Sequence, residues 1–154
     1  MEQKTKVVAE DGKQDLVITR TFDLPVELLF KAHVDPELVE QWMNTKVLKL
    51  DAKKFGSYQF QSADPKGNKY EFNGTIHECI PNKKITRTFE FVKMPFGVQL
   101  EIFEFEKLTD DTSRLHMHVI YESIAHRTEA LKMPFEYGIN MAHNQLQNIM
   151  DKLK

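Results

Sequence analysis

The sequence has little of what disulfide-bonded, zinc-binding or membrane-spanning proteins need. Cys79 is the only cysteine, so no disulfide can form within the chain and no Cys/His zinc spacing can be written. No apolar stretch approaches the roughly 20 residues of a membrane span, and the first 15 residues are too polar for a secretory signal. We therefore expect a cytoplasmic protein without a membrane span.

An excess of charge of one sign is also lacking. The chain carries 21 Lys and Arg against 23 Asp and Glu, a net charge of −2, which gives no strong field for attracting nucleic acid. No Gly-rich phosphate loop, nucleophile elbow or HExxH motif is present. The sequence predicts no nucleic-acid partner, no cofactor, no metal and no catalytic constellation.

Phenylalanine and methionine, in contrast, are abundant: the chain has 11 Phe and 7 Met but one Trp. Both side chains fill cores, and both also line adaptable apolar cavities. A chain of 154 residues is long enough to bury one real core. We expect a polar lead-in over residues 1–14 and a single domain over residues 15–154.

Hydrophobic periodicity predicts an α+β domain. Residues 16–22 are β-branched and apolar enough for a first strand. Pro25 and the Asp35-Pro36 pair are helix start signals, so two short helices are expected next. The short turns that follow favour an antiparallel meander. Its strands are expected at residues 47–51, 56–62, 69–80, 83–91, 98–108 and 114–121.

The C-terminal segment is helical, and Pro134 divides it into residues 123–132 and a long helix over residues 135–152. The apolar stripe of the long helix must bury against the sheet. Gly138 and Ala142 are small members of this stripe, and they leave either a gap for a ligand or a closely packed interface. The predicted stripe consists of Phe135, Gly138, Ile139, Ala142, Leu146, Ile149 and Leu153.

This order of elements resembles the helix-grip fold of the START and birch-pollen-allergen superfamily, in which a curved antiparallel sheet of six to seven strands surrounds a long C-terminal helix. Within it, the chain is similar to the domain shared with activators of the ATPase of the 90-kDa heat-shock chaperone. The similarity spans about residues 16–153. It is carried by residues 18–22, 25–30 and 35–38, Trp42, Gly56, residues 74–78, Pro81 and residues 136–138.

The resemblance implies an internal cavity for a small ligand that is lipid-like, polyketide-like or aromatic. Two positions depart from the family pattern in the expected wall of that cavity. Trp42-Met43 stands where relatives usually carry an aromatic pair, and Ile139 stands where they carry Trp. We therefore expect a pocket whose shape differs from theirs.

Alternation along the strands places Glu78 and Arg87 on the face toward the long helix. Across the Pro81-Asn82 turn they would be diagonal neighbours. They are interpreted as a polar anchor for a ligand, as a structural ion pair, or as residues that a β-bulge turns outward.

Several aromatic side chains are candidates for the cavity wall and equally for ordinary core: Phe55, Tyr58, Phe60, Phe72 and Phe89. Alternate turns of a meander lie at the same end of a sheet, so four apolar residues should meet there as a ligand gate. They are Met94, Phe96, Met133 and Phe135.

The histidines are the remaining candidates for chemistry. His116 and His118 share a strand face opposite the apolar set, so we expect them to face solvent. His143 is expected on the flank of the long helix, toward water or the cavity rim. No Asp, Glu or Cys is spaced to make it a metal ligand or a general base.

Three functions follow from these observations. The first is a binding module for a small apolar or amphipathic ligand. The second is a cyclase- or hydrolase-like enzyme that uses Glu78 as its base. The third, implied by the resemblance alone, is a chaperone cofactor acting by protein contact, although the partner-binding first domain of the dedicated activators has no counterpart in this sequence.

Overall fold

The computed structural model describes residues 3–154, and in that part of the chain eight strands form one antiparallel sheet in the order β1-β2-β8-β7-β6-β5-β4-β3. The predicted antiparallel meander is confirmed, and its sheet has one strand more than the six to seven expected. The additional strand is β1, inside the predicted lead-in, where three residues are too few to show an alternation. The strands are β1 (Lys6–Val8), β2 (Asp15–Phe22), β3 (Lys46–Leu50), β4 (Ser57–Ala63), β5 (Lys69–Ile80), β6 (Lys84–Phe91), β7 (Val98–Lys107) and β8 (Ser113–Ile120).

The helices begin where the sequence signals stand. The side chain of Asp35 accepts hydrogen bonds from the backbone amides of Glu37 and Leu38, which is the expected N-cap. Pro134 separates the last two helices. No helix within residues 3–154 is long and apolar enough to cross a bilayer. The helices are α1 (Val26–Val34), α2 (Pro36–Met43), α3 (Ile124–Leu131) and α4 (Phe135–Asp151).

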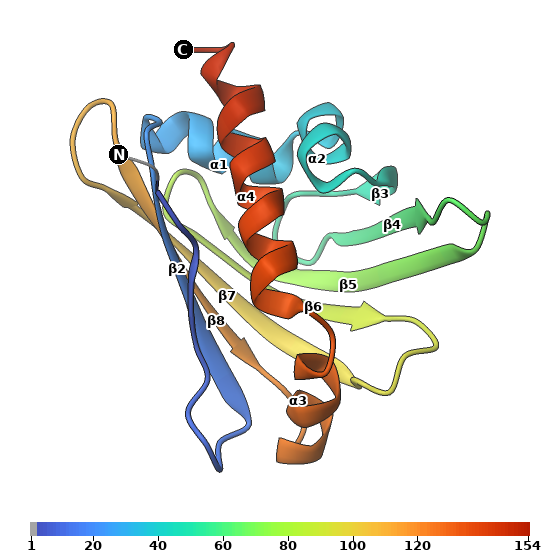
Figure 1. Cartoon of the computed structure of the whole chain (residues 1–154). Coiled ribbons are helices and arrows are strands. Elements are labelled where there is room, and N and C mark those ends of the chain that lie inside the picture. The colour runs from blue at the N-terminus through green and yellow to red at the C-terminus, as the bar shows by residue number, and fades with distance from the viewer. Residues whose placement is uncertain (1–2) are drawn as a thin grey trace.

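The long helix α4 runs across the inner face of the curved sheet, while α1 and α2 lie together at one end and α3 lies at the other (Figure 1). Helix α4 contacts α2 more extensively than it contacts any strand. Space is therefore left between α4 and the middle of the sheet, and side chains from both must fill it or line it.

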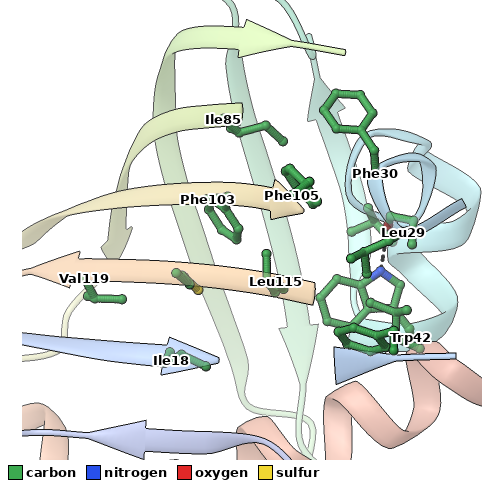
Figure 2. Packing of buried hydrophobic residues seen from close by; sticks show 14 of the residues in the cluster. Ile18, Leu29, Phe30, Trp42, Ile85, Phe103, Phe105, Leu115 and Val119 are labelled. Atoms are coloured by element: carbon green, nitrogen blue, oxygen red, sulfur yellow. Dashed lines mark hydrogen bonds between the residues drawn. The ribbon is translucent and has the colours of Figure 1, made fainter. Parts of the chain in front are cut away.

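Two rows of inward side chains cross the central strands. Strand pairing aligns Ile18, Met117, Phe103 and Ile85 on β2, β8, β7 and β6, and this row is apolar throughout. Figure 2 shows its labelled members on the same side of the sheet as Trp42. The neighbouring row is Leu16, Val119, Glu101, Arg87 and Ile76. Glu101 on β7 and Arg87 on β6 are charged, so an ion pair replaces an apolar pair in the middle of the sheet.

A β-bulge in β5 overturns one prediction. The register shifts between Ile76, which pairs with Arg87, and Glu78, which pairs with Thr86. The extra residue reverses the alternation, so Cys79 packs against the core in place of Glu78. The Glu78–Arg87 pair is therefore wrong, and the alternative of a β-bulge holds for Glu78 alone, because Arg87 remains on the inner face.

Candidate ligand-binding site

A cavity of about 220 Å³ lies between α4, the α1–α2 pair and the inner face of the sheet. Its wall is predominantly apolar, and the polar side chains in it are two histidines, one arginine, one glutamate and one glutamine. The lining residues are Ile18, His33, Val39, Trp42, Met43, Phe60, Arg87, Phe89, Gln99, Glu101, Phe103, Met117, Val119, Phe135, Ile139, Ala142 and His143.

Nine residues proposed from the sequence line this cavity. They include both departures from the family pattern, at Trp42-Met43 and at Ile139. The nine are Trp42, Met43, Phe60, Arg87, Phe89, Phe135, Ile139, Ala142 and His143.

The other eight proposed residues lie elsewhere. Phe55 is 69% exposed, and Gly138 is also exposed, with nothing within 4 Å of an added Cβ. Met133 is exposed and borders a separate surface hollow. Glu78 lies outside the cavity because of the bulge. Of the remaining four, Tyr58 and Phe96 belong to the hydrophobic core, and the partly buried Phe72 and Met94 pack against it.

The loop and the exit segment of the predicted gate lie at the same end of the sheet. The amide of Val98, at the end of the 93–97 loop, donates to Glu122 at 2.7 Å, so the two segments share one end as expected. Of the four gate residues, however, Phe135 alone lines the cavity. Phe96 packs into the core instead, and the partly buried Met94 packs against it.

Arg87 and Glu101 form the charged part of the wall. The Nε–H of Arg87 donates to Oε1 of Glu101 at 2.9 Å, and the two side chains are 13% and 5% exposed. Gln99 donates to Oε2 of the same carboxylate at 2.8 Å. The guanidinium carbon of Arg87 lies 4.6 Å and 4.7 Å from the ring centres of Tyr58 and Phe103. Both charges are thus compensated within the wall.

His33 contributes a neutral imidazole. Its Nδ1–H donates to the carbonyl oxygen of Leu29 one turn earlier in α1, at 2.9 Å. The ring packs against Trp42, Phe103 and Phe105 at centroid distances of 5.2 to 5.7 Å. Burial is the main cause that lowers the pKa of His33 to about 4, and the nearby charge of Arg87 acts in the same direction. The hydrogen bond to Leu29 opposes this shift without cancelling it.

His143 is buried, which corrects its predicted position on a helix flank. Its Nδ1 lies 2.7 Å from the hydroxyl of Thr5, which also accepts from Arg20 at 3.3 Å. Its ring meets Phe22 edge-on at 5.4 Å between centroids. Burial, with smaller effects from His33 and Arg20, lowers the pKa of His143 to about 3. Thr5 precedes β1, so the sequence prediction lacked the segment that receives this side chain.

Eight lining residues were missed. Gln99, Glu101 and Phe103 alternate inward along β7, whereas Leu100 and Ile102 take the outward parity. Both parities of this strand contain apolar residues, so alternation alone could not orient it. The missed residues are Ile18, His33, Val39, Gln99, Glu101, Phe103, Met117 and Val119.

The hypothesis that Glu78 is a general base required its carboxylate to lie in the cavity, and it does not. Glu78 accepts from Lys84 at 3.1 Å and from Thr86 at 3.0 Å on the outer face. Both hydrogen bonds lower the pKa of the Glu78 carboxyl, and the one from Lys84 has the larger effect. His116 and His118 are about 40% exposed and pair with Glu106 and Asp15, so their predicted solvent exposure is confirmed.

A curved antiparallel sheet around a long C-terminal helix defines a helix-grip domain, as the sequence resemblance implied. Within that class, residues 23–151 match the family described as "Activator of Hsp90 ATPase homolog 1-like protein", and the chain belongs to this family. No curated protein matches the chain.

Solved structures share this fold at low sequence identity. A crystal structure of a Mycobacterium smegmatis protein has a TM-score of 0.85 at 20% identity, over 95% of this chain and 96% of that one. An Arthrobacter aurescens protein solved by NMR has a TM-score of 0.86 at 17% identity, over 96% and 91%. A Rhodobacter sphaeroides protein has a TM-score of 0.84 at 17% identity, over 97% and 100%.

Proposed function

We propose that this protein is a binding module that holds a small, mainly apolar molecule in the cavity between α4 and the sheet. The observation that carries the proposal is the cavity itself, whose apolar wall contains a buried and internally compensated Arg87–Glu101 pair. Compensated charges in an apolar wall favour a ligand that is apolar over most of its surface and meets few polar groups.

The volume narrows the ligand class. A cavity of roughly 150 Å³ lined by apolar side chains already binds benzene, whereas pockets for drug-sized ligands span roughly 300 to 1,000 Å³. The 220 Å³ measured for this cavity lies between them. Among lipid-like, polyketide-like and aromatic candidates, it favours a compact aromatic or alicyclic molecule over a long acyl chain.

Trp42 provides a direct test. It is the only tryptophan of the chain, and it lines the cavity. Its indole N–H donates to the carbonyl oxygen of Ala32 at 2.7 Å, so the ring faces a ligand without a free polar group. Ligand entry should change its fluorescence. Native mass spectrometry of protein purified from cells would show whether a small molecule is carried along and what its mass is.

A variant that fills the cavity and a control variant on the same helix test whether the ligand binds inside the cavity. Ala142→Leu adds volume inside the cavity and should abolish the fluorescence response, whereas Met141→Leu alters the exposed side of the same helix and should leave it intact. If no small molecule copurifies and no aromatic or alicyclic probe changes Trp42 fluorescence up to millimolar concentration, the proposal fails.

A further inference from the structure

His33 has one nitrogen without a partner. A carbonyl oxygen only accepts hydrogen bonds, so the 2.9 Å contact with Leu29 requires the proton to be on Nδ1. Nε2 then carries a lone pair and no proton. Nε2 is buried and has no hydrogen-bond partner, while the residue as a whole is 9% exposed and forms part of the cavity wall.

An unpartnered buried acceptor is costly, because folding removes its water without replacing the hydrogen bond. Among its aromatic neighbours, Phe103 and Phe105 have no polar side-chain atom, and the indole N–H of Trp42 already donates to Ala32. The imidazole that carries this lone pair forms part of the wall of the space that a ligand would occupy. A ligand with a suitably placed O–H or N–H group would satisfy it.

The same wall disfavours an anion. The charge of Arg87 is compensated by Glu101, which also accepts from Gln99. Burial keeps both histidines neutral near pH 7, since the pKa of His33 is lowered to about 4 and that of His143 to about 3. An entering carboxylate would lose its hydration and gain no net positive partner.

We propose that the ligand is an uncharged alcohol or phenol whose hydroxyl donates a hydrogen bond to Nε2 of His33. This inference rests on the proposed binding function and adds the polar chemistry that the ligand must carry. The rest of the molecule faces apolar side chains such as Trp42, Phe103 and Ile139.

Three probes of similar shape test the proposal: naphthalene, 2-naphthol and 2-naphthoate. Titration calorimetry at about pH 7 should show 2-naphthol binding about three- to tenfold more tightly than naphthalene, the effect of one neutral hydrogen bond. 2-Naphthoate should bind more weakly than 2-naphthol. Tightest binding by 2-naphthoate, or equal binding of naphthalene and 2-naphthol, would overturn the inference and leave the binding function standing. Binding of none of the three would overturn both.

His33→Leu removes the acceptor and should bring the ratio of the two affinities close to one. The matched control is His116→Leu, which changes a histidine on the outer face of the sheet and should leave the ratio unchanged. A His33→Leu variant that keeps the full preference for 2-naphthol would refute the role of His33.

The unaltered protein allows a second measurement that does not depend on the variant folding. Long-range ¹H–¹⁵N spectra report the protonation and hydrogen bonding of each imidazole nitrogen. The Nε2 resonance of His33 should move when 2-naphthol is added and stay in place with naphthalene. An Nε2 that is protonated in the free protein, or that does not respond to 2-naphthol, would contradict the proposal.

Discussion

The sheet carries ion pairs on both faces, and two of them, one from each face, differ in how far they are exposed to solvent. On the outer face, the side chains of Lys84 and Glu78 are 37% and 39% exposed, so water hydrates both charges. On the inner face, Arg87 and Glu101 are 13% and 5% exposed and depend on each other and on Gln99. The two cations are three residues apart on β6. The face on which a charge lies, and not its place in the sequence, decides how much its partner matters.

The histidines repeat this contrast. His116 and His118 lie on the outer face, where each pairs with a half-exposed carboxylate, Glu106 and Asp15. His33 and His143 lie inside and are held neutral by burial. The cavity wall, in which Arg87 and Glu101 compensate each other, therefore carries no net charge at neutral pH, which suits an uncharged ligand.

The largest expected effect comes from breaking the inner ion pair. Arg87→Met should destabilise the protein by about 3 to 5 kcal/mol, because it leaves the Glu101 carboxylate buried without its cation. Lys84→Met, the matched change on the outer face, should cost less than about 1 kcal/mol. Urea unfolding of both variants measures the difference. Equal losses would mean that the two pairs do not differ in burial as the structure shows.

The next-largest effect on stability should come from lowering the pH, through the two buried histidines His33 and His143. Their pKa values are lowered in the folded state to about 4 and about 3, against about 6.5 in the unfolded chain. Below pH 6.5 the unfolded state binds protons that the folded state does not, so stability is full above that pH and falls as the pH drops. Each histidine contributes a slope of up to about 1.4 kcal/mol per pH unit.

The window between about pH 6.5 and 5 isolates this effect, because unfolded carboxyl groups titrate mainly below it. Denaturant titrations at both ends of the window provide the measurement. Equal stability at the two ends would show that the buried histidines are not neutral and desolvated.

Filling the cavity should have a smaller effect of opposite sign. Ala142→Leu places an isobutyl group in open apolar space, so stability should hold or rise by up to about 1 to 3 kcal/mol. If the helix and sheet were closely packed there, the same change would cost about 1 to 3 kcal/mol. Thermal unfolding distinguishes the two outcomes by sign. A clear fall in melting temperature would contradict the cavity.

The smallest effect is expected at an exposed position near the start of α4. Gly138 is exposed, and an added methyl group meets nothing within 4 Å. Gly138→Ala should stabilise the protein by about 0.4 to 1 kcal/mol, since alanine loses less backbone freedom in a helix. Calorimetry should show a slightly higher melting temperature and an unchanged affinity for 2-naphthol. A loss of that affinity would place Gly138 at the cavity after all.

The sequence by itself determined the order and type of the main elements, because their signals are local. Asp35 caps α2 with its own side chain, Pro134 interrupts the last helical segment, and short turns impose antiparallel pairing. Apolar residues such as Trp42 and Ile139 were assigned to the cavity wall from their equivalence to family positions, and the structure places them there.

The tertiary structure alone decided the polar half of the site. A one-residue bulge in β5 separated Glu78 from Arg87, and strand pairing selected Glu101 as the partner. The position of α4 turned His143 inward and Gly138 outward, where Thr5 and open solvent receive them. The orientation of a polar side chain depends on the hydrogen-bond partners that distant segments bring to it, and these follow from register and helix rotation, which local sequence patterns do not encode.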